Sequence, residues 1–142
     1  MIRQTKASAV WKGGLKDGQG TVSTESGVLS NVAYNFSQRF ESARGTNPEE
    51  LIAGALASCF SMALSAELGK ANLTPESIAT QATLTFDRKN EKPTITRIHL
   101  ECTAKVPGAA AEAFKNIAEG AKAGCPISRA LNTEITLDAK LS

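Results

Sequence analysis

The fold of this chain is decided by residues 47–70, which read NPEELIAGALASCFSMALSAELGK. Asn47 can cap a helix, Pro48 suits the first helical position, and Glu50 at the third position can return to the cap backbone. These start signals predict one long helix that ends at about Lys70.

The predicted helix carries no charge between Leu51 and Ala66, and apolar or small residues cover its whole circumference. A membrane span is one interpretation, but the run is slightly short and is diluted by serines and a glycine, so we expect no membrane contact. A helix that is apolar all round is instead buried on all sides. Because one small sheet and one further helix would leave part of it uncovered, we expect a second subunit to supply the missing cover.

Short extended segments precede this helix. Ser8 to Lys12 and Gly20 to Thr24 flank a glycine-rich turn, which is a pattern that predicts a hairpin. Residues 34–41 alternate with a period of two, and this period predicts a further strand.

The part of the chain after the long helix contains both strands and helices. In chain order we predict strands from Ser77 to Asp87 and from Thr94 to Val106, a helix over residues 109–123, a short helix from Pro126 to about Asn132, and a strand over residues 134–141. The first two strands form an antiparallel pair, and Cys102 shares the apolar face of the second, so we expect it in the core. Runs of strands interrupted by helices indicate an α+β fold.

Length and charge narrow the class of protein. At 142 residues the chain is about the size of one ordinary domain, so we expect a single domain over residues 1–142. The net charge of +2 is too small, and the lysines are too scattered, for the basic surface that nucleic acid requires. Residues 1–6 contain no apolar export signal, so we expect a cytoplasmic protein.

Few side chains could carry chemistry. His99, the only histidine, alternates onto the polar face of its predicted strand, which favours an exposed residue over a catalytic base. The sequence contains no phosphate-binding loop and no metal-binding motif, so we expect neither a cofactor nor a metal. The three cysteines, at positions 59, 102 and 125, form no close pair, which argues against a zinc knuckle or a dense disulfide scaffold.

Cys59 and Cys125 lie in different local settings. Cys59 is in the middle of an apolar helix, which favours a buried, unreactive thiol unless a cationic partner comes from elsewhere. Cys125 precedes a helix, where free N–H groups favour an anion, so it is either the more acidic thiol or a residue that caps a tight turn. A separation of 66 positions says nothing for or against a disulfide between them.

One arginine and one glutamate could supply the charges of a site. We place Arg39 at the site, although alternation alone favours an exposed strand residue beside Glu41. Glu50 is expected to act as the structural cap. This leaves Glu49, at the second helical position, free to fix an arginine through a bidentate pair.

Three segments resemble the OsmC/Ohr family, the osmotically inducible and organic hydroperoxide resistance proteins. They are residues 45–51 (GTNPEEL), 59–64 (CFSMAL) and 121–128 (AKAGCPIS). The similarity spans nearly the whole chain. Residues 20–27, together with an arginine at position 39, are closer to the OsmC branch of the family than to the Ohr branch.

The resemblance implies an intertwined homodimer, with two long central helices wrapped by antiparallel sheets and with active sites at the subunit interface. It implies that Cys59 is the peroxidatic thiol and Cys125 the resolving thiol. Arg39, supplied by the partner subunit, and Glu49 would then keep Cys59 ionised. The resemblance therefore makes Cys59 the ionised thiol, whereas the local sequence alone favours Cys125 as the more acidic one.

The resemblance also implies a thiol peroxidase. Cys59 would reduce an organic hydroperoxide and become a sulfenic acid, Cys125 would close a disulfide with it, and a dithiol such as a lipoylated protein would restore both thiols. The residues that we expect to line an apolar pocket for the organic group are Phe36, Phe40, Leu56 and Met62. Two alternatives stay open: a non-catalytic dimer that binds an apolar ligand, and a cysteine redox sensor.

Overall fold

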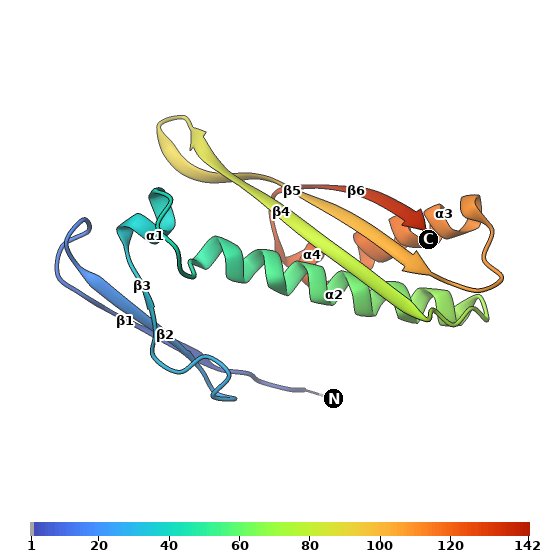
Figure 1. Ribbon diagram of the computed structural model, residues 1–142, viewed down its shortest axis with the longest axis horizontal. Helices are drawn as coiled ribbons and strands as arrows, with labels where there is room; N and C mark the ends of the chain where they lie inside the picture. The colour runs from blue at the N-terminus through green and yellow to red at the C-terminus, as the bar shows by residue number, and fades with distance from the viewer. Residues whose placement is uncertain (1) are drawn as a thin grey trace. The chain divides into compact units, whose positions relative to one another are not determined.

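The computed structural model describes residues 2–142, which fold into two sheets and four helices (Figure 1). In chain order the elements are β1 (Ala7–Lys12), β2 (Gln19–Thr24), β3 (Val32–Tyr34), α1 (Phe36–Phe40), α2 (Pro48–Lys70), β4 (Ser77–Lys89), β5 (Lys92–Lys105), α3 (Ala111–Gly124), α4 (Pro126–Ala130) and β6 (Glu134–Leu141). The chain forms two compact units, of which the first ends at Leu51 and the second begins at Ile52. The α+β class is confirmed.

The first unit contains an antiparallel sheet with the strand order β1-β2-β3. The predicted hairpin is confirmed as β1 and β2. The register places Trp11, Gly20 and Tyr34 directly opposite one another across the three strands. Because direct cross-strand partners share one face of a sheet, the two aromatic rings meet over the glycine.

The predicted strand over residues 34–41 is wrong beyond Tyr34, because Asn35 caps a helix and α1 begins at Phe36. The side chain of Asn35 accepts a hydrogen bond from the backbone N–H of Gln38 at 3.0 Å, which caps the new helix. Phe36 and Phe40 are four residues apart, and this spacing fits a helix face as well as a strand face. Their ring centroids lie 4.9 Å apart. The capping asparagine therefore decided between two patterns that both fit the sequence.

Helix α2 is confirmed, and its start is the predicted one. The side chain of Asn47 accepts a hydrogen bond from the backbone N–H of Glu50 at 2.7 Å. Four residues spaced four apart are fully buried in the core of the second unit: Leu56, Phe60, Leu64 and Leu68. The opposite side of the helix is exposed within one chain, and Met62 on that side is 77% exposed. Burial on all sides is therefore not reached within a single chain.

By length and a mean hydropathy of 1.6, α2 could also cross a membrane. The packing of its leucines against a sheet is the arrangement of a core helix in a globular unit. That α2 contacts no membrane stays a prediction.

The second unit contains a sheet with the strand order β4-β5-β6. Strands β4 and β5 form the predicted antiparallel pair, and they are joined by Asn90 and Glu91, which both have positive φ, at 52° and 64°. Such a two-residue turn matches the twist of a hairpin. The expectation of antiparallel sheets is confirmed for the pairs β1–β2, β2–β3 and β4–β5 but is wrong for β6, which runs parallel to β5. The helices α3 and α4 form the crossover that a parallel neighbour requires.

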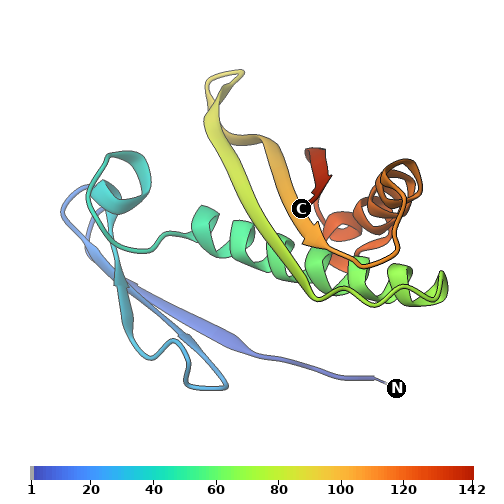
Figure 2. The ribbon, with the colours of Figure 1, turned by 45° about the vertical axis from the view of Figure 1, so that its right-hand side comes forward.

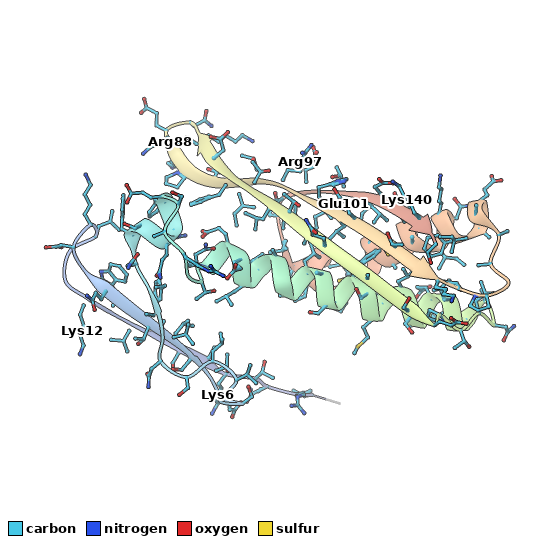
Figure 3. All side chains as sticks on the ribbon, in the orientation of Figure 1. Lys6, Lys12, Arg88, Arg97, Glu101 and Lys140 are labelled. Atoms are coloured by element: carbon cyan, nitrogen blue, oxygen red, sulfur yellow. The ribbon has the colours of Figure 1, made fainter. Side chains whose placement is uncertain are left out.

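Helices α2 and α3 cover the same face of this second sheet (Figure 2). On the covered face the central residues of β5 are buried, and the apolar residues of β4 and β6 that flank them are buried or partly buried. Cys102 on β5 is 2% exposed, which confirms it as a core residue. The residues that alternate with the buried ones on β5 and β6 point to the opposite face of the sheet, which no helix of the second unit covers. Arg97, Glu101 and Lys140 are exposed on that face (Figure 3). The core of the second unit thus lies on one side of its sheet.

Candidate active site

The two thiols that are 66 positions apart in the sequence meet in the second unit. Cys59 lies on α2 immediately before the buried Phe60 and is half-buried, whereas Cys125 lies between α3 and α4 and is fully buried. Both are free cysteines, and their Sγ atoms are 2.6 Å apart as a hydrogen-bonded pair. A disulfide bond is about 2.05 Å long, so a disulfide needs little further approach.

The segment Gly124-Cys125-Pro126 explains the position of the second thiol. Helix α3 ends here, with the backbone N–H of Cys125 donating to the carbonyl of Ala121 at 2.9 Å. Pro126 then starts α4, and a residue before proline avoids the helical conformation, as Cys125 does with a ψ of 128°. The break between two helices therefore holds the thiol against α2.

The two thiols differ in acidity. Burial raises the pKa of the Cys59 thiol above its ordinary value of 9.0, and the hydrogen bond to Cys125 raises it further. Burial also acts to raise the pKa of Cys125, but it is outweighed by the hydrogen bond that this thiol shares with Cys59, by contacts with the side chain of Ser128, and by the backbone N–H groups of Ser128 and Ile127. The pKa of Cys125 is therefore lowered. Those N–H groups lie at the start of α4, where the local sequence predicted that an anion would be favoured.

A single chain thus favours the negative charge on Cys125. Because the two thiols share a hydrogen bond, they titrate as a pair and not as independent groups. For Cys59 to carry the charge, a positive group must act on it more strongly than on Cys125. The second unit alone therefore accounts for the proximity of the thiols, and an additional cation is needed to make Cys59 the nucleophile.

Arg39 and Glu49 form a close ion pair in the first unit. The Nη2 atom of Arg39 lies 2.8 Å from Oε1 of Glu49, and its Nε donates to Oε1 at 3.0 Å and to Oε2 at 3.3 Å. Glu49 is buried, at 8% exposure, and sits at the second position of α2. Glu50 is exposed, and its backbone N–H donates to the side chain of Asn47. The expected return contact from the Glu50 side chain to the cap backbone stays a prediction. The three hydrogen bonds between Arg39 and Glu49 fix the plane of the guanidinium, since a carboxylate matches its geometry.

The guanidinium of Arg39 also borders an aromatic cavity of about 240 Å³ in the first unit. Its carbon Cζ lies 5.3 Å from the centroid of the Phe40 ring. The residues that line the cavity are Trp11, Leu15, Tyr34, Asn35, Phe36, Arg39 and Phe40. Of the four expected pocket residues, Phe36 and Phe40 line it. Leu56 is instead fully buried in the core of the second unit, and Met62 projects from the exposed side of α2.

Sequence reasoning missed Trp11 and Tyr34 as cavity residues. Their rings contact each other with centroids 5.6 Å apart. The signal that could have found them is the small residue between them, because a glycine inside a strand often marks a place where other groups approach closely. The prediction of a hairpin gave Gly20 a place in a strand, but it did not supply the register that pairs it with both rings.

His99 is the remaining side chain that the sequence offered as a possible catalytic base. His99 is half-buried on β5, and its Nδ1 lies 2.6 Å from the hydroxyl of Thr136 on β6. Its place on the polar face is confirmed, although it is less exposed than the sequence suggested. Within residues 2–142, no three His, Cys, Asp or Glu side chains are grouped so that they could hold a metal ion.

Comparison with known proteins identifies the family. A family model described as OsmC-like protein matches residues 41–140. Peroxiredoxin OsmC from Escherichia coli (strain K12) is 53% identical over 141 residues, which cover 99% of each chain. Among solved structures, an OsmC-like protein from Mycoplasma pneumoniae superposes with a TM-score of 0.75 at 15% identity, covering 99% of each chain. An organic hydroperoxide resistance protein OsmC from Legionella pneumophila gives a TM-score of 0.71 at 22% identity, covering 100% of this chain and 98% of the other.

The fold and the paired thiols define a class of small α+β proteins built on a long central helix. The chain belongs to the OsmC-like family, as the three sequence segments indicated.

Proposed function

We propose that this chain is a thiol-dependent peroxidase that reduces organic hydroperoxides to alcohols. The class of activity follows from a relative of the same length that is named a peroxiredoxin and is 53% identical over nearly the whole chain. The observation that carries the proposal is the 2.6 Å separation between the Sγ atoms of Cys59 and Cys125. It supports a two-cysteine cycle within one subunit.

The first half of the cycle oxidises Cys59. Its thiolate attacks the distal oxygen of the hydroperoxide, so the O–O bond breaks while an S–O bond forms. The alkoxide that leaves takes up a proton and becomes the alcohol. The sulfur is thereby oxidised by two electrons to a sulfenic acid.

The second half of the cycle protects this sulfur from further oxidation. The sulfur of Cys125 attacks the sulfenic sulfur of Cys59, an S–S bond forms, and the departing hydroxide combines with the proton of the second thiol to leave as water. An external dithiol then reduces the disulfide by two electrons and restores both thiols. We propose a dithiol, such as a lipoylated protein, as this reductant, and a cytoplasmic location, where such reductants are kept reduced.

We propose that Arg39, held in place by Glu49, keeps the Cys59 thiol ionised. Burial raises the pKa of this thiol, and an adjacent guanidinium would oppose the effect by stabilising the thiolate. The bidentate contact with Glu49 supports this role, since it fixes the direction in which the guanidinium points. In the proposed dimer the arginine comes from the partner subunit.

The proposed assembly is an intertwined homodimer built around α2. Five exposed residues form one stripe along this helix, which we call the open face of α2: Ala55, Ser58, Met62, Ser65 and Ala66. None of them is charged, and an exposed helix side that combines a large apolar residue with small ones is suited to contact with another protein surface. Packing against a second copy would bury it and would give α2 the cover that its sequence predicts.

The test is steady-state consumption of cumene hydroperoxide in the presence of a dithiol. Cys59→Ser should lose essentially all turnover, because the hydroxyl cannot replace the thiolate, while Cys102→Ala should keep it. An apolar-ligand binder would consume no peroxide even as wild type. A redox sensor would form the disulfide but would turn over slowly with the dithiol. Either result would refute the proposal.

A further inference from the structure

Gly20 occupies a strand position that no other residue could take without moving two aromatic rings. It is buried in β2 and is paired with Trp11 on one side and with Tyr34 on the other. A Cβ atom at this position would lie 2.6 Å from Cε3 of Trp11 and 2.7 Å from Cε1 and Cζ of Tyr34. Because Gly20 has no side chain, both rings can pack directly against the backbone of β2 and contact each other.

The two rings form a defined wall of the cavity in the first unit. Their centroids are 5.6 Å apart with the planes inclined by 47°, which is within the range that aromatic pairs prefer. The indole N–H of Trp11 donates to the carbonyl of Gly13 at 3.1 Å, so the ring is held in place. Phe36 and Phe40 form a second tilted pair in the lining, with an angle of 40° between their planes.

The same cavity has a single charged residue in its lining, which is Arg39. A ligand that suits this lining has a polar end for the guanidinium and a bulky apolar end for the rings. Aryl-alkyl hydroperoxides combine these two features. A compact alkyl hydroperoxide would reach the arginine but would leave most of the aromatic wall without contact.

We propose that Trp11 and Tyr34, whose rings pack over Gly20, form the subsite that binds the organic group of the substrate. We propose further that this subsite selects aryl-alkyl hydroperoxides over compact alkyl ones. This inference rests on the proposed function, because it takes Arg39 to be the arginine that acts at the peroxidatic thiol. All of the residues that carry it belong to the first unit.

Trp11 is the only tryptophan in the chain, so its fluorescence reports on the subsite directly. Reduced protein would be titrated with 2-phenyl-2-propanol, the unreactive alcohol that cumene hydroperoxide yields, and with tert-butanol as the compact analogue. The emission should change in a saturable manner with the aryl alcohol and should stay unchanged with tert-butanol at the same concentrations. Saturation by both alcohols with equal affinity would overturn the selectivity.

Gly20→Ala tests the wall while it retains the fluorescent reporter. The added methyl displaces both rings, so the dissociation constant of 2-phenyl-2-propanol should rise about tenfold. The ratio of kcat/KM for cumene hydroperoxide to kcat/KM for tert-butyl hydroperoxide should fall by about the same factor. This ratio does not depend on how much of the variant is folded. Tyr34→Ala should lower it as well, since it removes one ring.

Val10→Ala is the matched control, because Val10 precedes Trp11 on β1, points to the other face of the sheet and is 53% exposed. It should keep the wild-type ratio and affinity. If Gly20→Ala also keeps them while peroxide is turned over normally, the subsite is refuted and the proposed function survives. If the emission responds as expected but no peroxide is consumed, the cavity stands as a binding site for aryl groups, while the proposed function and the selection among hydroperoxides are refuted.

Discussion

The acidity of Cys59 is the central question at the scale of single residues. Within one chain, burial raises the pKa of this thiol, while at its neighbour Cys125 the hydrogen bonds with Cys59 and with the start of α4 outweigh burial and lower the pKa. A thiol whose pKa lies above its ordinary value is almost entirely protonated at neutral pH and is a poor nucleophile. The proposed role of Arg39 is to reverse this order by favouring the thiolate at Cys59.

Arg39→Met should therefore move the alkylation of Cys59 to higher pH. Loss of the positive charge raises the pKa of Cys59, so the midpoint of its iodoacetamide alkylation should rise by about 1 to 3 pH units. Peptide-resolved mass spectrometry would follow Cys59 separately from Cys125. Arg44→Met is the matched control, because Arg44 is an exposed arginine nearby in the sequence, and it should leave the midpoint unchanged. An unchanged midpoint in Arg39→Met would remove the arginine from the mechanism.

The sequence predicted part of the site at this scale. The rules of helix capping separated Glu50, which is at the cap, from Glu49, which pairs with Arg39. The proximity of the two thiols could not be predicted from spacing, because only tertiary structure brings residues so far apart together. The pairing of Cys59 with Cys125 was left open by spacing and local chemistry, and it was implied only by the family resemblance.

Helix α2 is the element on which the fold depends, and its two sides differ within one chain. One side buries leucines and a phenylalanine in the core of the second unit, while the open face of α2 stays exposed. The composition of the helix predicted apolar contacts all round. It could not show which contacts come from the same chain, since serine and alanine fit either environment.

Leu64→Ala should destabilise the protein by about 2 to 5 kcal/mol, because it removes a fully buried side chain and leaves a cavity. Urea unfolding at fixed protein concentration would measure the loss. Leu15→Ala makes the same truncation at a residue that is 63% exposed, and it should cost less than about 0.5 kcal/mol. Equal losses for the two variants would show that α2 is not the core helix.

Two other elements show where patterns in the sequence were insufficient. Residues 36–40 satisfied both a strand period and a helix spacing, and the capping contact of Asn35 decided for α1. The last strand was predicted at the right residues, but its direction was not. Its parallel pairing with β5 depends on how α3 and α4 cross the sheet, which no local pattern encodes.

At the scale of the whole molecule, the proposed dimer accounts for two observations at once. It buries the open face of α2, and it offers a source for the cation that Cys59 lacks within its own unit. A complete site would then exist only when two copies are associated. Assembly and activity should be lost together.

Met62→Glu tests this link, because it places a charge in the middle of the open face of α2, where Met62 is 77% exposed in one chain. Burying an unpaired charge is costly, so the variant should be monomeric in sedimentation experiments and should lose most of its peroxidase activity. Lys70→Glu, an exposed charge change at the end of the same helix, should stay dimeric and active. A monomeric wild type with full activity would contradict the proposed assembly.

The disulfide between Cys59 and Cys125 is tested most directly by mass spectrometry of non-reduced peptides after one equivalent of cumene hydroperoxide. We predict a single crosslink that joins the peptides containing positions 59 and 125, with Cys102 left as a free thiol, and no such crosslink in Cys125→Ser. Untouched thiols in the wild type, or a Cys59 oxidised beyond the sulfenic acid while Cys125 stays free, would contradict the account.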